Sequence, residues 1–406
     1  RTSASLVLSR DGSHAARAAA EVLADMRGLA AKIGQMASYV DGFVPEGHRE
    51  AYERGLARLR SAAATSPPES IRRLVEQELG APLDRLFGEW EDAPFASASI
   101  GQVHRARLPS GERVAVKVQH PGIDKAVESD LENASMLEGL VELVGPRELD
   151  ARTLFEDVRA RFREELDYGL EAARQTQFAE LHRGHPYIVI PRVVPDRSSR
   201  RVLTSELMSG VSLEEAARLE ETERRRYAEV LWEFVFKGTL VFGLFNADPH
   251  PGNYLFQPGG RVVFLDFGCV QLIETDKQVR ARAMHSAATR RDEAAFAECA
   301  KALLGTRGGS YEKAVIPYVR RCFEPLFGSP FRVTSAYVAE VVGATRELKR
   351  HVFAKDKSFV PLGRGMVFMN RLQFGFYSVL ARLDTAADYA GVERRFLTEA
   401  GFLETA

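Results

Sequence analysis

The chain has 406 residues, 45% of them hydrophobic and 27% charged, with 32 Gly and 18 Pro. This composition is that of an ordinary globular protein, large enough for two lobes and extensions. The 55 Lys and Arg balance 56 Asp and Glu, and a net charge of −1 excludes the basic surplus of a nucleic-acid-binding protein. Three widely spaced cysteines exclude a disulfide framework or a four-cysteine zinc site, and they suit a reducing compartment.

The first predicted helix covers residues 14–42. Its apolar residues recur at heptad-like spacing from Val22 to Val40, which indicates a buried stripe. Lys32 and Gln35 lie off that stripe, on a neighbouring face. Taken alone, this pattern also fits a solvated lysine beside a core stripe. A second helix is predicted at 70–79.

Residues 95–103 read Phe-Ala-Ser-Ala-Ser-Ile-Gly-Gln-Val and occupy the place of a phosphate-binding Gly-rich loop. Aligned on G-x-G-x-x-G-x-V, the glycine positions become Ala96, Ala98 and Gly101, and Val103 closes the loop. Because alanine disfavours the positive φ angles that glycine visits freely, we expect a stiffer loop. Ser99 completes the predicted ATP-binding residues of this loop. The alternative is a simple turn between strands.

A short apolar strand with one lysine follows, Val114-Ala-Val-Lys117. This pattern is typical of the lysine that contacts the α- and β-phosphates of ATP, so Lys117 is a predicted catalytic and ATP-binding residue. A hairpin turn at 109–112 precedes the strand. The carboxylate partner of Lys117 is expected in the helical stretch 123–181, in which Glu165, Asp167 and Glu171 are the candidates.

Strands are predicted at 187–190 and 201–206. The segment Glu206-Leu-Met-Ser-Gly210 then has the position of a kinase hinge, whose backbone groups would contact adenine. Glu206 and Met208 are therefore assigned to ATP binding. A plain strand-to-helix connection is the alternative for this segment.

The most informative motif is Asp248-Pro-His-Pro-Gly-Asn253, followed by Asp266-Phe-Gly268 at the end of an apolar run from Arg261. Phosphoryl transfer needs a carboxylate to orient the attacking oxygen, here Asp248. It also needs oxygen ligands for Mg²⁺, a hard cation, and Asn253 and Asp266 supply them. The spacing therefore predicts a magnesium-dependent phosphotransfer site that uses ATP. His250 is expected to serve the turn and not to bind a metal.

Only a few residues separate Asp266 from the predicted helical sequence of 275–304, and no Ala-Pro-Glu motif follows. Protein kinases dock peptides on the longer segment found there, so its absence favours a non-protein substrate or water as the acceptor. The apolar stretches 230–245 and 366–380 contain charged residues and fall short of the roughly 18 uncharged residues that a bilayer helix needs. We predict a buried helix at 230–245.

These motifs, together with Lys32-Ile-Gly-Gln35 and Glu165-Leu-Asp167, resemble those of the UbiB family of AarF-domain atypical kinases. The resemblance runs over nearly the whole chain. It implies an α+β, helix-rich, bilobal protein-kinase-like fold with an N-terminal helical extension over the active-site cleft. It also implies that Glu171 pairs with Lys117.

The same resemblance implies a regulatory group in which Glu165 and Asp167 lie near Lys32 and Gln35. One departure concerns the catalytic loop: the family usually has His two residues before the catalytic Asp, and here that residue is Asn246. We expect altered loop hydrogen bonding as a result.

The predicted domains are a helical extension (1–82), an N-lobe (83–209), a C-lobe (210–350) and a C-terminal helical tail (351–406). The predicted function is binding of Mg-ATP with hydrolysis or phosphotransfer to a small-molecule or lipid-like substrate, linked by resemblance to isoprenoid-quinone or lipid metabolism. The alternatives are a protein kinase and a nucleotide-gated binding module without turnover. We expect a cytoplasmic protein with peripheral contact to a membrane or a lipid-enzyme complex, and no nucleic-acid partner.

Overall fold

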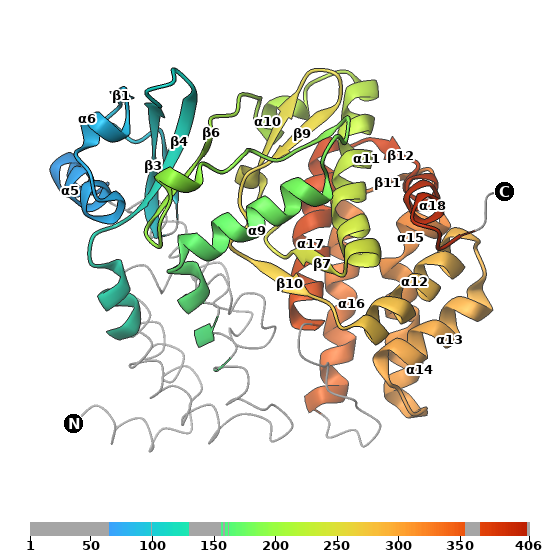
Figure 1. Cartoon of the computed structure of the whole chain (residues 1–406). Helices are drawn as coiled ribbons and strands as arrows, with labels where there is room; N and C mark the ends of the chain where they lie inside the picture. Colours follow the sequence, from blue (N-terminus) through green and yellow to red (C-terminus); the bar gives the residue numbers. More distant parts are fainter. Residues whose placement is uncertain are drawn as a thin grey trace, which may run out of the picture. The chain divides into compact units, whose positions relative to one another are not determined.

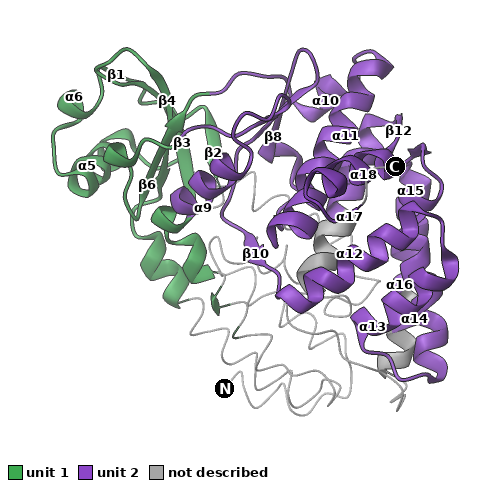
Figure 2. Ribbon diagram, turned by 45° about the vertical axis from the view of Figure 1, so that its right-hand side comes forward, with its two compact units in different colours: residues 1–145, 150–170, 193–207 green, residues 146–149, 171–192, 208–406 purple. Residues whose placement is uncertain are grey.

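The computed structural model describes residues 65–98, 100–129, 156, 159–160, 162–353 and 366–403. The predictions for the helix 14–42, for Lys32 and Gln35, and for Ser99 lie outside the described residues. The chain forms two compact units (Figure 2). Unit 1 takes residues 1–145, 150–170 and 193–207, and unit 2 takes 146–149, 171–192 and 208–406.

Unit 1 is built on a five-stranded antiparallel sheet in the order β1-β3-β4-β6, with β2 paired to β3 (Figure 1). Alternation along β4 puts Val114, Val116 and Val118 on the buried face and Lys117 on the other. Its elements are α5 (Pro68–Leu79), α6 (Leu83–Leu86), β1 (Glu89–Trp90), β2 (Ala96–Ala98), β3 (Gly101–Arg107), β4 (Arg113–Gln119), η2 (Pro195–Arg197) and β6 (Val202–Glu206).

Helix α5 covers the buried face of this sheet. Ile71, Leu74 and Val75 lie one helical turn apart and pack in one cluster with the β4 valines. The helix begins at Pro68, because the first turn of a helix does not need the backbone N–H that proline lacks. It ends at Gly80, whose φ of 69° is the left-handed conformation of a helix cap.

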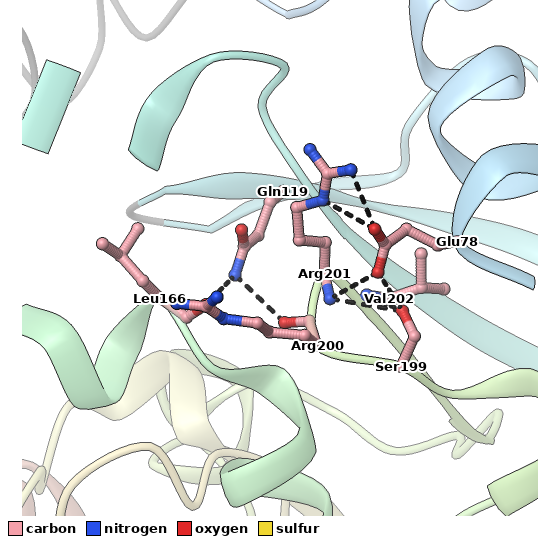
Figure 3. A network of polar contacts seen from close by, with 7 residues as sticks. All are labelled: Glu78, Gln119, Leu166, Ser199, Arg200, Arg201 and Val202. Carbon is pink, nitrogen blue, oxygen red and sulfur yellow. Dashed lines mark hydrogen bonds and ion pairs between the residues drawn. The ribbon is translucent and has the colours of Figure 1, made fainter. Parts of the chain in front are cut away.

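An ion pair links Glu78 of α5 to Arg201, the residue before β6, within unit 1 (Figure 3). Arg201 Nε donates to Glu78 Oε1 at 2.8 Å, and Ser199 Oγ donates to Glu78 Oε2 at 2.7 Å. Burial alone would raise the pKa of Glu78, but these hydrogen bonds outweigh burial and lower it. The carboxylate therefore stays ionised and ties the segment before β6 to the end of α5.

Unit 2 is mainly helical around the long helix α11 (Figure 1). Its described strands form a three-stranded sheet, β5-β9-β8, and the pairs β10-β7 and β11-β12. Residue 170 of α9 lies in unit 1 and the residues from 171 lie in unit 2. The elements are α9 (Tyr168–Leu181), β5 (Ile188–Val189), α10 (Leu213–Ala216), α11 (Glu221–Lys237), η3 (Gly238–Phe242), β7 (Leu244–Asn246), η4 (Pro251–Asn253), β8 (Tyr254–Gln257), β9 (Arg261–Phe264), β10 (Val270–Leu272), α12 (Thr275–Thr289), α13 (Glu293–Leu304), α14 (Gly309–Cys322), α15 (Glu324–Phe327), β11 (Phe331–Arg332), α16 (Ser335–Phe353), α17 (Met366–Leu383), β12 (Ala386–Ala387) and α18 (Tyr389–Glu399).

The C-terminal helices α17 and α18 belong to the core of unit 2. Trp232 on α11 stacks on Tyr377 of α17 and packs on Tyr389 of α18. Its Nε1 donates to Glu393 at 2.9 Å, and this fully buried carboxylate also accepts from His285 Nδ1 at 3.0 Å. A buried carboxylate with two such partners fixes α18 against α11 and α12.

The prediction of one helix over 230–245 is wrong at its C-terminal end. Helix α11 ends at Lys237, a π-helical turn (η3) follows, and Gly243 with φ of 71° turns the chain into β7. A Cβ at Gly238 would lie 2.8 Å from the Leu244 carbonyl oxygen, so the chain folds back where only glycine fits.

The helical sequence predicted at 275–304 is likewise two helices. Arg291 has φ of 61° and ends the first, and Asp292 accepts from Ala295 N to cap the second. Among the described residues, no helix is long and apolar enough to cross a membrane.

Candidate active site

The alanine-rich segment of unit 1 is a tight β-hairpin. β2 pairs with β3 in the register Ala96 to Val103 and Ala98 to Gly101. A Cβ on Gly101 would overlap the Val118 carbonyl oxygen and lie 2.7 Å from Tyr168 Oη. Glycine is therefore required at position 101 because the chain packs closely there. It is not required for a positive φ angle, the reason expected from the sequence, since Gly101 does not adopt one.

Lys117 is placed by strand register. It pairs with Val103 on β3 and with Leu203 on β6, and its Nζ lies 4.9 Å from the centroid of the Tyr168 ring. Tyr168 is buried at the start of α9, where its N–H donates to the Arg200 carbonyl at 2.8 Å. A cation over an aromatic face is held in place by the ring quadrupole. Sequence reasoning missed Tyr168, because no spacing relates it to Lys117.

Asp167 and Glu165, the two carboxylates predicted to be regulatory, lie next to the start of α9. Asp167 Oδ1 accepts from Leu170 N at 3.1 Å and caps the first turn of α9. Glu165 is half-buried just before it. The structure therefore gives Asp167 a local structural role, and the predicted grouping with Lys32 and Gln35 stays a prediction.

The predicted hinge is an extended connection. Glu206 ends β6 opposite Val114, and its side chain is exposed. Met208 follows in unit 2 and is half-buried. Gln257 Nε2 donates to the Ser209 carbonyl at 2.7 Å, which fixes the end of the connection on β8.

In unit 2, the loop 248–253 is closed by its own side chains. Asn253 Nδ2 donates to the Asp248 carbonyl at 3.1 Å and to Asp248 Oδ2 at 3.3 Å. His250 Nδ1 accepts from Gly252 N at 3.0 Å, which confirms the predicted turn role of His250. Because its amide nitrogen is bound to Asp248, Asn253 directs its amide oxygen elsewhere.

Asn246 joins this loop to the Asp266 segment. Its Nδ2 donates to the Asp266 carbonyl, and its Oδ1 accepts from Asp248 N at 3.2 Å. Leu265 N also donates to the Asn253 carbonyl at 3.0 Å. The amide thus supplies one donor and one acceptor, and it holds together the two backbone segments that carry the predicted catalytic and metal residues.

Asp266 lies two residues after β9, and its Oδ1 accepts from Gly268 N at 2.9 Å. The next residue, Phe267, is fully buried and packs on Phe178 of α9 with ring centroids 5.0 Å apart. This aromatic contact anchors the turn that presents Asp266.

Helix α9 brings two charged residues to the same turn. Arg174 Nη1 donates to the Gly268 carbonyl at 2.9 Å. Glu171 is only 4% exposed, and a Cβ on Gly268 would lie 3.8 Å from Glu171 Oε2. Three residues apart on a helix, the two side chains share one face. This spacing was the available signal for Arg174, which the sequence analysis missed.

The chain after Gly268 enters a strand pair at once. β10 pairs antiparallel with β7, with Val270 opposite Asn246, and Ala247 N donates to the Cys269 carbonyl at 2.7 Å. Helix α12 then begins at Thr275. Residues 266–289 are all described, and within them no long loop follows the Asp-Phe-Gly motif, as predicted.

The oxygen donors present suit a hard cation. Asn253 offers an amide oxygen and Asp266 a carboxylate, the ligand types that Mg²⁺ takes beside phosphate and water. In the part of the chain that the structure describes, no group of three or more His, Cys, Asp and Glu side chains could hold a metal by itself. Mg²⁺ takes more oxygen ligands than these two residues supply, so the remaining ligands would come from water or phosphate.

The chain is similar to known proteins both in sequence and in structure. The ABC1 atypical kinase-like domain matches residues 58–300. The mitochondrial atypical kinase COQ8 of Saccharomyces cerevisiae is 30% identical over 71% of this chain and 54% of its own length. The mitochondrial atypical kinase COQ8B of Danio rerio is 33% identical over 61% of this chain and 39% of its own length. A solved structure of Rv3197 with erythromycin, from Mycobacterium tuberculosis, has a TM-score of 0.67 and 26% identity over 92% of each chain.

Proposed function

Because the chain belongs to the ABC1 atypical kinase-like family, we propose that it binds Mg-ATP and transfers the γ-phosphoryl group to a non-protein acceptor or to water. The membership confirms the predicted UbiB-type resemblance, and the α+β kinase-like fold is confirmed with it. The chain spans about half or less of the length of the two atypical kinases compared above.

The observation that carries the proposal is the hydrogen-bonded set Asn246, Asp248, Asn253 and Asp266 in unit 2. Asp248 is the only one of the four whose carboxylate is expected to orient the attacking oxygen and take its proton. Asn253 and Asp266 would hold Mg²⁺, which, when bound, neutralises charge on the phosphates. Asn246 keeps both segments together and so acts as a positioning residue.

Lys117 and Glu171 complete the proposed set. Lys117 would neutralise the α- and β-phosphates, as the family pattern implies. Glu171 is buried beside the Asp-Phe-Gly turn, and the pairing of its carboxylate with Lys117 is part of the proposal.

A non-protein acceptor is supported by the short path from Asp266 to α12, which leaves no segment for docking a peptide. Rv3197, whose fold is similar, was solved in a complex with erythromycin, which is not a protein. The link to isoprenoid-quinone or lipid metabolism belongs to the same proposal.

The test separates turnover from binding. Asp248→Asn should lower the rate of ATP turnover by about 10²- to 10⁴-fold, the usual contribution of a positioned general base. Its affinity for Mg-ATP should stay within about threefold of wild type, since Asp248 is not a proposed phosphate or metal ligand. Equal loss of binding and turnover would show that Asp248 has a structural or metal-binding role, and undiminished turnover would remove it from the mechanism.

A further inference from the structure

A surface hollow of about 570 Å³ lies directly on the proposed catalytic loop. Its walls are all in unit 2: the turn 250–252, Tyr254, Leu255, Ser212, Glu214 and Arg382. We call it the catalytic-loop hollow. Its volume falls within the roughly 300–1,000 Å³ of small-molecule sites. The turn that forms one wall connects Asp248 to Asn253, so a molecule in the hollow would contact the loop that carries Asp248.

Helix α17 is fixed against this loop. A Cβ on Gly375 would overlap the ring of Pro249, so the helix backbone approaches the catalytic loop as closely as glycine permits. Arg224 Nη1 donates to the Leu383 carbonyl at 2.6 Å and holds the C-terminal end of α17. The wall that contains Arg382 is therefore anchored on both sides.

Two residues that line the hollow, Arg382 and Glu214, form an ion pair that can be broken at a small cost in free energy. Arg382 Nη1 lies 2.8 Å from Glu214 Oε1, and the two side chains are 54% and 59% exposed. Ion pairs this exposed contribute little to stability, because solvent screens them. Both charged groups can therefore turn toward a ligand without loss of the fold.

Besides the ion pair, the hollow is lined by two side chains that can donate a hydrogen bond, Ser212 and the exposed His250, and by apolar groups. Since His250 Nδ1 accepts from Gly252 N, the neutral ring carries its proton on Nε2, which no other described group engages. Leu255 and the Tyr254 ring supply apolar contact.

We propose that the catalytic-loop hollow holds the phosphoryl acceptor, a small molecule with an apolar body and a hydroxyl group. This inference rests on the proposed function. The hydroxyl oxygen forms a bond to the γ-phosphorus of ATP while the bond from that phosphorus to the β–γ bridging oxygen breaks. ADP leaves with the bridging oxygen, and the hydroxyl proton passes to the Asp248 carboxylate. His250 Nε2–H positions the acceptor oxygen, and Leu255 contacts the apolar body.

Straight-chain primary alcohols from butanol to decanol test this assignment, with the methyl ether of each as a non-acceptor. Transfer of labelled phosphate from ATP to each alcohol is measured with the full chain, and alcohol binding is measured without ATP by ligand-observed NMR. We expect the KM for the alcohol to fall by about fourfold per added methylene until the hollow is filled. The ethers should bind without being phosphorylated.

Two variants probe the two contacts. His250→Asn keeps an acceptor for Gly252 N but loses the Nε2 donor, and we expect a KM for alcohols about three- to tenfold higher. Leu255→Ala should reduce the dependence of KM on chain length. Leu303→Ala, the same change at a half-buried leucine of α13, should leave both KM and chain-length dependence at wild-type values.

The outcomes are distinct. ATP hydrolysis by wild type without binding or phosphorylation of any alcohol would overturn the hollow assignment and leave the proposed function standing. Phosphorylation with unchanged KM in both hollow variants would also overturn it. Absence of Mg-ATP binding and turnover would sink the proposed function and this inference together, whereas alcohol binding lost in His250→Asn or Leu255→Ala supports the hollow.

Discussion

In unit 1 the predicted nucleotide-binding residues are placed by strand register. In unit 2 the predicted catalytic and metal residues are placed by side chains that form hydrogen bonds to the backbone. Lys117 and Gly101 take their positions from a ladder of regular β pairs. Asp248, Asn253 and Asp266 lie in turns whose shape depends on a few hydrogen bonds, above all those of Asn246. Unit 1 should therefore respond mainly to changes of side-chain volume, and unit 2 to changes of donors and acceptors.

The largest effect is expected at Gly101. Any Cβ there overlaps the Val118 carbonyl oxygen, so Gly101→Val should destabilise the protein by about 3 kcal/mol, at the upper end for overpacking. Urea unfolding measures this change. Ala98→Gly, at the paired position of the hairpin, should cost about 1 kcal/mol or less. Similar costs at the two positions would contradict the claim that packing sets this hairpin.

A smaller effect is expected at Asn246. Asn246→Ala leaves the Asp266 carbonyl and Asp248 N without this partner, at a cost of about 1–3 kcal/mol. Turnover should fall more than nucleotide affinity, because the relative position of Asp248 and Asp266 is lost. Asn246→Asp keeps an acceptor for Asp248 N but replaces the donor to the Asp266 carbonyl with a charged oxygen, so it tests the donor bond together with an added negative charge. Wild-type turnover in Asn246→Ala would show that the loop is held by other contacts.

Much of the unit 2 site was predictable from the sequence because its parts are local. Asp248 and Asn253 are five residues apart in one loop and meet locally. A strand delivers Asp266, which the hydrogen bonds of Asn246 join to that loop. Tyr168 and the close approach of Gly375 to Pro249 were not predictable, since they depend on how distant segments pack.

The helix predicted over 230–245 failed for a related reason. The apolar pattern of a buried helix continues through η3 into β7, and periodicity cannot distinguish a buried helix from a buried strand. Only Gly238 and Gly243 signalled the change.

The smallest effect concerns a polar side chain in unit 2 that no hydrogen bond places. Both nitrogens of His182 lack a hydrogen-bond partner, and the ring packs among Phe178, Phe234 and Phe242. Burial, and then nearby His185, lower the pKa of His182 to about 3. As pH falls from about 6.5, the unfolded state takes up a proton that the folded state does not, so stability decreases.

His182→Phe should remove up to about 1.4 kcal/mol per pH unit from this acid sensitivity below pH 6. Urea unfolding of both proteins at pH 7.5, 6.0 and 5.0 measures the difference in slope. Identical pH slopes would mean that His182 titrates normally and that the aromatic packing does not hold it neutral.

The most direct test of the proposed function is thermal stabilisation by Mg-ATP in wild type and Asp266→Asn. A ligand at about 100 times its Kd stabilises the folded state by about 2.7 kcal/mol, so loss of affinity is read as loss of the shift in Tm. We predict a clear increase in Tm for wild type with Mg-ATP, none with ATP and a chelator, and little or none for Asp266→Asn with Mg-ATP. An equal increase in Tm for wild type and Asp266→Asn would contradict the assignment of Asp266 to the metal.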